Sequence, residues 1–211
     1  MESKWALTCE RLKAFTGAES ENWCGEAFAC LQEQYSQQQR FYHNFEHIEF
    51  CLQEFEQVRS ELTDPLAVEL ALWFHDLIYF LPPQQNEHKS AAVAYRLLIE
   101  VNEALAEKVK AYIEWTDYGK VWPESLNEID FLYMRDIDYS AFARDSAAFK
   151  KDSDNLGREC PWKSRDELNK GRRAYLNSLI TSDESLFKTE YFIQKCERQA
   201  QANIRQALAE L

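Results

Sequence analysis

The segment DPLAVELALWFHDLIYF, residues 64–80, decides the fold of this chain. It opens with Asp64-Pro65, a helix start signal, because Asp accepts a hydrogen bond at the cap position and Pro fits the first helical position. The residues that follow are apolar on nearly every side, which predicts a buried central helix. The pair His75-Asp76 interrupts this apolar run. Burying a titratable pair is costly unless a partner satisfies it, and a bound metal ion is one such partner.

Helical spacing recurs on both sides of this segment. One apolar stripe begins after Asn44, and another helix begins near Asn86, which we expect to cap it. Further helices are expected over about 103–115 and 129–142, with a loop at 119–123 between them and two more long helices in the last third. Five Gly and five Pro are few for 211 residues, which favours helices joined by short loops. We therefore expect an all-α fold, a single-domain helical bundle over residues 1–211.

Charge and cysteine content exclude several classes of protein. The net charge is −12 and the sequence pI is about 4.9. Duplex nucleic acid, which requires clustered Lys and Arg, is not an expected partner. A small anionic substrate remains compatible, because a metal ion and a local Arg can reverse the field inside a pocket.

The six cysteines form no C-x-x-C pair, so we expect free thiols in a reducing compartment. The start of the chain is polar and no leader peptide is expected. No apolar stretch approaches the length of a membrane span. These features predict a cytoplasmic protein that does not insert into membranes. They are compatible with either a monomer or a homo-oligomer.

Two imidazoles and a few carboxylates form a candidate metal site. His47 lies on the inward stripe, one turn before Cys51. Together with His75, Asp76 and a later Asp from residues 129–142, it offers the mixture of imidazole and carboxylate that mid-row divalent metals favour. Adjacent residues on a helix point about 100° apart. His75 and Asp76 can share one ion only if it lies between their two directions, or else Asp76 bridges two ions. Either arrangement predicts an ion against the side of the central helix.

Three motifs in order carry a resemblance to a known family. They are RFYHNxxHI at residues 40–48, WFHDxxY at 73–79 and NExxSA at 86–91. With a distant Asp138, the pattern H…HD…D resembles the HD-domain superfamily of metal-dependent phosphohydrolases, in particular a bacterial branch known as predicted phosphohydrolases. Weaker similarity continues through residues 136–138, Gly171-Arg172 and Ala200-x-x-Asn203, so the resemblance extends from about Gln39 over most of the chain.

The resemblance implies an HD-type helical fold and a divalent metal held by His47, His75, Asp76 and Asp138. It favours Asp138 over Asp136 as the last ligand. Asp136 is then expected to be a helix cap, a hydrogen-bond acceptor for a metal ligand or a surface charge. The sequence does not select among Mn, Mg, Co, Ni, Fe and Zn, or between one ion and two. The motif-bearing core is expected at about 39–142, with the C-terminal helices, about 143–211, packed on it.

Other polar residues of the motifs are candidates for catalysis and substrate binding. Glu87 is the candidate for proton transfer or water orientation beside Asp76, although a Glu in a first turn also stabilises a helix N-terminus. Arg40 is a candidate for holding a phosphate through its planar guanidinium, or else a surface Arg. His43 is expected to contact the phosphate, support a ligand or lie on the surface. Asn86 is a candidate for binding the substrate, and the alternative is that it only caps its helix.

These residues predict hydrolysis of a small phosphate ester, a nucleotide or a related phosphomonoester, by metal-activated water. The alternative is a non-catalytic HD module that binds a metal or nucleotide as a sensor. The sensor alternative is favoured by one departure from the family pattern. Thr116 is followed by Asp117, Tyr118 and Gly119, whereas this branch often carries a His three positions after the Thr. A third interpretation is a purely structural helical domain in which the His-Asp pair is a core hydrogen bond.

Overall fold

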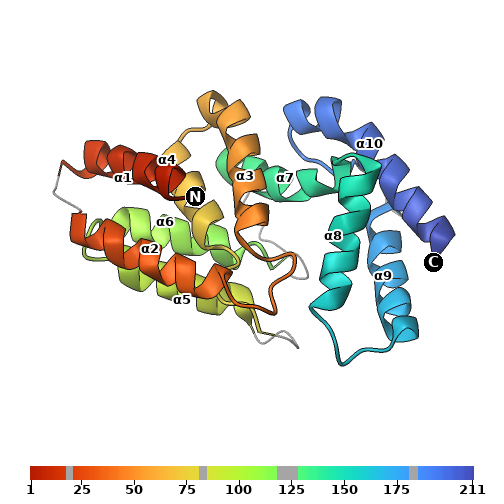
Figure 1. Ribbon diagram of the computed structural model, residues 1–211. Coiled ribbons are helices and arrows are strands. Elements are labelled where there is room, and N and C mark those ends of the chain that lie inside the picture. The colour runs from red at the N-terminus through yellow and green to blue at the C-terminus, as the bar shows by residue number, and fades with distance from the viewer. Residues whose placement is uncertain (18–20, 81–84, 118–127, 181–184) are drawn as a thin grey trace. The chain divides into compact units, whose positions relative to one another are not determined.

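The computed structural model describes residues 1–17, 21–80, 85–117, 128–180 and 185–211. Throughout these ranges the regular elements are helical, which confirms the predicted all-α class. The chain divides into two compact units, Met1–Phe131 and Leu132–Leu211 (Figure 1). The two units are described separately below. Their union into one domain with a core at about 39–142 stays a prediction.

The first unit is arranged around one central helix, α4. Its elements are α1 (Glu2–Thr16), α2 (Glu21–Tyr35), α3 (Phe45–Val58), the 3-10 turn η1 (Arg59–Glu61), α4 (Pro65–Phe74), α5 (Asn86–Leu98) and α6 (Glu103–Glu114). The helices α1, α3, α5 and α6 all pack against α4. Every side chain from Leu66 to Phe74 is buried, so the apolar run does form the core of this unit as predicted.

The predicted helix cap at Asp64 is confirmed, and the one at Asn86 is wrong. Asp64 accepts a hydrogen bond from the amide of Ala67 at 3.2 Å, with Pro65 next to it at the start of α4. Asn44 caps α3 by accepting from the amide of Glu46 at 2.8 Å. Asn86 does not cap α5. It is the first residue of that helix, because Gln85 adopts a left-handed conformation with φ of 56° and occupies the cap position.

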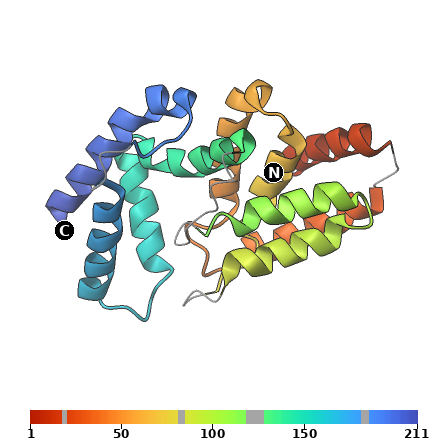
Figure 2. The same ribbon diagram turned by 180° about the vertical axis from the view of Figure 1, so that it is seen from behind.

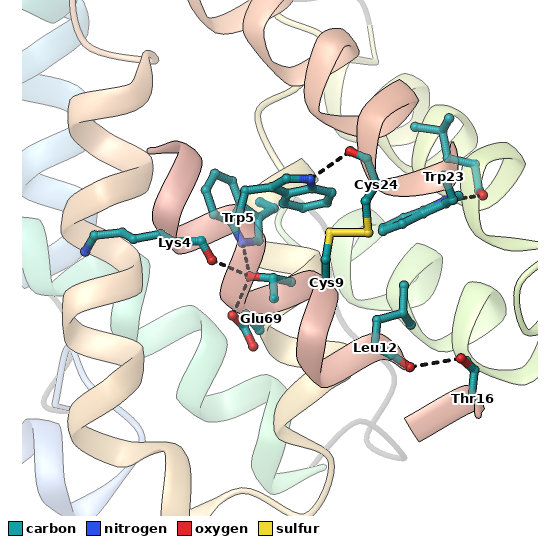
Figure 3. Close-up of a disulfide and its surroundings, with 11 residues drawn as sticks. Lys4, Trp5, Cys9, Leu12, Thr16, Trp23, Cys24 and Glu69 are labelled. Carbon is teal, nitrogen blue, oxygen red and sulfur yellow. Dashed lines mark hydrogen bonds between the residues drawn. A yellow bond between two sulfur atoms is a disulfide. The ribbon is translucent and has the colours of Figure 1, made fainter. Parts of the chain in front are cut away.

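The hairpin of α1 and α2 overturns the expectation that all cysteines are free. Cys9 and Cys24 form a disulfide between these two helices (Figure 3). The indole of Trp5 donates to the carbonyl of Cys24 at 2.8 Å beside it. A search for close C-x-x-C spacing misses this pair, because the two residues are 15 positions apart and meet only when the hairpin closes. The remaining cysteines form no disulfide in the part of the chain that the structure describes: Cys30, Cys51, Cys160 and Cys196.

The second unit holds one helix more than predicted. Its elements are most of α7 (Ile129–Tyr139), the 3-10 turn η3 (Ser140–Ala143), α8 (Ser146–Arg158), α9 (Arg165–Ile180) and α10 (Glu190–Glu210), seen from both sides in Figures 1 and 2. The helix α10 packs against η3 and α9. The unpredicted α8 is strongly polar, but its start is marked by Asp145, which accepts from the amides of Ala147 and Ala148.

The remaining predictions about organisation concern loops and membranes. The expected loop at 119–123 lies outside the described residues. Among the helices in the described ranges, none is both long enough and apolar enough to cross a membrane.

Candidate metal centre

Three predicted ligands of the first unit converge on one point. The Nε2 atoms of His47 and His75 are 3.3 Å apart. One carboxylate oxygen of Asp76 lies 3.1 Å from His75 Nε2 and 3.5 Å from His47 Nε2. Each of the three residues offers one ligand atom to this group, which forms a potential metal site. We call these three residues the HHD cluster.

Two residues of the cluster, His75 and Asp76, follow the last residue of α4, and the position of an ion against the side of this helix stays a prediction. His47 comes from the inward face of α3, as predicted. The helix α4 ends at Phe74, with His75 at the cap position. The amide of Leu77 turns back to the carbonyl of Phe74 at 3.1 Å. His75 keeps a helical backbone conformation, with φ of −60° and ψ of −39°, and its Nε2 lies 3.1 Å from the Asp76 carboxylate.

Side chains from other segments bind a carbonyl at the end of α4 and two carbonyls in the turn that follows it. The hydroxyl of Tyr35 donates to the carbonyl of Trp73 at 2.9 Å, and burial raises the pKa of Tyr35, which keeps its proton in place. Arg40 donates to the carbonyls of Asp76 and Leu77 at 2.7 and 2.6 Å. The last carbonyls of a helix otherwise lack partners, and this end carries a partial negative charge that favours a cation.

The ring of His75 is held in the tautomer that a metal ligand needs. Its Nδ1 lies 2.9 Å from the carbonyl of Leu72. A carbonyl oxygen can only accept, so Nδ1 carries a proton, and in the neutral ring Nε2 then has the lone pair. That lone pair faces His47 and Asp76. A ring N–H donated to a backbone carbonyl is a common way of orienting a metal-binding His.

The separations within the HHD cluster fit a divalent ion. A point equidistant from three atoms separated by 3.1, 3.3 and 3.5 Å lies about 1.9 Å from each. These separations are compatible with the bonds of roughly 2.0–2.2 Å that imidazole and carboxylate ligands would make to a divalent ion. Two imidazole nitrogens and one carboxylate oxygen are borderline-to-hard donors, compatible with Zn, Fe, Co, Ni or Mn. The residues present therefore fit the predicted metal.

Electrostatics keep Asp76 ionised. Burial alone would raise the pKa of Asp76, but the neighbouring imidazoles of His75, His43 and His47 hold it well below its usual range. The carboxylate is thus available as a ligand across the neutral range. Its side chain is 21% exposed, whereas those of His47 and His75 are nearly inaccessible, so the cluster faces outward on the Asp76 side.

His43 lies on the outer side of the cluster. Its ring stacks on that of Tyr79 at 3.9 Å between centroids, and Tyr42 packs edge-on against it at 4.9 Å. All three of these rings are half-buried. His43 is close enough to lower the pKa of Asp76. A contact between His43 and a substrate phosphate stays a prediction, and this placement is compatible with it.

Arg40 is buried, which excludes the surface alternative considered for it. Besides the carbonyls of Asp76 and Leu77, Arg40 donates to the carbonyl of His43 at 3.2 Å. Its guanidinium lies over the rings of Tyr35 and Tyr79. The described contacts of Arg40 are therefore with the protein itself, and its role in binding phosphate stays a prediction.

Two residues of α5 hold the chain that leaves the HHD cluster. The side-chain amide of Asn86 both accepts from the amide and donates to the carbonyl of Phe80, each at 3.0 Å. The hydroxyl of Ser90 accepts from the amide of Ile78 at 2.9 Å. The sequence motif contains both residues but does not reveal that they bind backbone. A substrate contact by Asn86 stays a prediction.

The proposed proton-transfer residue and the surface histidine occupy the first turn of α5. Glu87 is half-buried there and is not among the residues that form the HHD cluster. Its alternative role at the helix N-terminus is compatible with this position. His88 is exposed and pairs with Glu114 at 2.8 Å, as expected for a surface residue.

The two candidate aspartates of α7 belong to the second unit. Asp136 is fully buried and accepts from the amides of Lys188 and Thr189 and from the Thr189 hydroxyl at 2.7 Å. Since Thr189 is the cap residue of α10, Asp136 serves to start that helix, one of the roles foreseen for it. Asp138 is half-buried. Its role as the fourth ligand stays a prediction.

No family model matches the chain, and comparison with curated proteins and with solved structures gives no significant similarity. The resemblance to the HD superfamily accordingly remains an expectation from its motifs.

Proposed function

We propose that this protein is an HD-type metal-dependent phosphohydrolase that acts on a small phosphate ester, such as a phosphomonoester of a nucleotide. The observation that carries the proposal is the meeting of two imidazole nitrogens and one carboxylate oxygen at 3.1–3.5 Å in the first unit. The bond of His75 Nδ1 to the Leu72 carbonyl adds support, since metal-binding histidines commonly donate their other ring N–H in this way.

The chain's own residues would divide the work between holding the metal and receiving the ester. His47, His75 and Asp76 hold the divalent ion, with Asp138 as the proposed further ligand. A bound divalent ion would supply Lewis acidity and activate a water molecule for attack on phosphorus. His43, which is close enough to Asp76 to lower its pKa, is the proposed contact to the phosphate. Glu87 remains the proposed residue for moving the proton of the attacking water.

Metal content and turnover test this proposal together. Protein purified without chelators is analysed for bound metals, titrated with Mn²⁺ and assayed against a panel of phosphomonoesters and nucleotides. We expect Mn²⁺ binding and hydrolysis in the wild type, and loss of both in Asp76→Asn, which keeps the side-chain shape but removes the charge. His75→Ala should behave similarly. His88→Ala is the matched control, because His88 is exposed and pairs with Glu114 away from the cluster.

The possible outcomes separate the alternatives. Mn²⁺ binding that depends on Asp76, without turnover of any ester, would favour the sensor module. Protein that carries no metal and refuses added Mn²⁺ while melting cooperatively would contradict the metal site and favour a structural His-Asp pair. Hydrolysis that survives in Asp76→Asn would place the chemistry elsewhere in the molecule.

A further inference from the structure

The guanidinium of Arg40 joins the two chain segments that carry the HHD cluster. One nitrogen, Nη1, donates both to the carbonyl of His43, before α3, and to that of Asp76, after α4. The other, Nη2, donates to the carbonyl of Leu77 at 2.6 Å. Arg40 is thus a bridge between the segment leading into the His47 helix and the turn that contains His75 and Asp76.

The position of this bridge matters because it holds a ligand residue by its own backbone. Asp76 lies outside the regular hydrogen bonding of α4, so its peptide orientation depends on tertiary contacts. Ser90 and Asn86 hold Ile78 and Phe80, two and four residues further on. Arg40 holds the carbonyl of Asp76 itself, and the direction of a side chain follows from the orientation of its backbone.

The bonding pattern requires an arginine. A guanidinium is planar and offers donors on both terminal nitrogens, whereas a lysine ammonium is a compact point charge on a flexible stem. The guanidinium carbon of Arg40 also lies over the rings of Tyr35 and Tyr79, at 5.3 and 5.7 Å from their centroids. Lysine at this position keeps the charge but cannot reproduce the fork between two successive carbonyls. Charge and geometry can therefore be tested separately.

We propose that Arg40 is a positioning residue: by fixing the backbone of Asp76 and Leu77, it directs the Asp76 carboxylate into the HHD cluster and so sets the affinity for a divalent ion. This inference deepens the proposed function and rests on its metal site. Residues that orient metal ligands typically change metal affinity by roughly 10–100-fold when they are replaced.

The test compares Arg40→Lys and Arg40→Gln with the wild type by two measurements. In the metal-free protein, hydrogen–deuterium exchange of the amides of residues 75–80 reports how firmly the turn is held. Calorimetric titration with Mn²⁺ reports the affinity. We expect faster exchange in this turn and Mn²⁺ binding weaker by about 10–100-fold in both variants. The neutral, shorter Gln provides a second variant in case Lys at this buried site prevents folding.

Arg11→Lys is the matched control. Arg11 is also largely buried in the first unit and also contacts α4, through an ion pair with Glu69 at 2.8 Å. It makes no described contact with the turn after Phe74. We expect this control to lower the melting temperature while leaving the exchange of residues 75–80 and the Mn²⁺ affinity at wild-type values.

The outcomes distinguish this inference from the proposed function. Wild-type Mn²⁺ affinity in a folded Arg40→Lys variant would overturn the role of Arg40 alone. Equal loss of affinity in Arg11→Lys would also overturn it, since general loosening of the unit would then be the cause. A wild-type protein that binds no Mn²⁺ would overturn the metal site, and with it the claim about affinity.

Discussion

At the scale of single residues, the members of the HHD cluster could be predicted from the sequence. The residues that hold the neighbouring backbone in place could not. His47, His75 and Asp76 stand out in the sequence because titratable groups in apolar surroundings need partners. Arg40, Asn86 and Ser90 carry no such signal. Their donors and acceptors bind main-chain groups, and any residue at the far end could offer the same carbonyl or amide. Sequence motifs therefore suggested substrate contacts for Arg40 and Asn86, where the structure shows backbone contacts.

Glu69 is a second buried charge on α4, and it predicts a pH effect on stability. Burial raises the pKa of Glu69, against hydrogen bonds from Thr8 at 2.6 Å and Arg11 at 2.8 Å, with Glu56 nearby also acting to raise it. A raised folded-state pKa means that the folded protein binds the proton more readily than the unfolded chain does. Stability linked to Glu69 is then present below its unfolded pKa and is lost as the pH rises through the folded value.

Glu69→Gln isolates this effect. The variant keeps one oxygen, which can accept from Thr8 or from Arg11 but not from both, and it does not titrate. We expect the stability of the wild type relative to Glu69→Gln to increase as the pH is lowered from 7 towards 5, measured by chemical denaturation at each pH. Glu33→Gln, at an exposed position on α2, is the control. A difference that is constant or that shrinks on acidification would contradict the assignment.

At the scale of helices, periodicity located the elements better than their ends. The apolar run continues to Phe80, so the sequence predicts a longer central helix than the one observed. The helix α4 ends at Phe74, where Tyr35 binds the carbonyl of Trp73 and the chain tightens into a turn. His75 and Asp76 therefore lie in the turn that follows α4 and not within the helix itself.

The α1–α2 hairpin predicts a measurable contribution from its disulfide. Trp5 packs edge-on against Trp73 of α4 at 5.2 Å, so the hairpin is part of the core of the first unit. Closing a loop of 15 residues with a disulfide stabilises a protein by about 3 kcal/mol, mainly by restricting the unfolded chain. We therefore expect reduction with dithiothreitol to lower the free energy of unfolding of this unit by about that amount.

Two variants control the disulfide measurement. Cys9→Ser should have the lower stability from the start and should no longer respond to dithiothreitol. Cys160→Ser, which removes one of the free thiols, should respond as the wild type does. Equal stability of the oxidised and reduced wild type would contradict a stabilising disulfide between Cys9 and Cys24.

At the scale of the whole molecule, the chain divides into two compact units. The two candidate aspartates belong to the second unit, and the HHD cluster belongs to the first. Asp136 accepts hydrogen bonds at the start of α10, and Asp136→Asn would point amide hydrogens at the donors of Lys188 and Thr189. We expect this variant to destabilise the second unit by about 1–3 kcal/mol and to leave Mn²⁺ affinity unchanged.

Asp138→Asn should do the opposite if the resemblance to the HD superfamily holds. Replacing a ligand should weaken Mn²⁺ binding by more than the roughly 10–100-fold typical of residues that only orient ligands, with little change in stability. Calorimetric titration and thermal unfolding of both variants decide between them. Loss of Mn²⁺ affinity in Asp136→Asn, with none in Asp138→Asn, would reverse the assignment.

The sequence by itself determined the helical class, the buried central helix, and the two imidazoles and the carboxylate of the HHD cluster. These features follow from local properties: the period of apolar residues, cap residues, and the cost of burying charge. Only the tertiary structure decided where α4 ends, which cysteines pair, and which carbonyls Arg40 binds. The disulfide and the bonds of Arg40 to Asp76 and Leu77 join residues that are 15, 36 and 37 positions apart, so they depend on how the helices pack and leave no periodic trace in the chain.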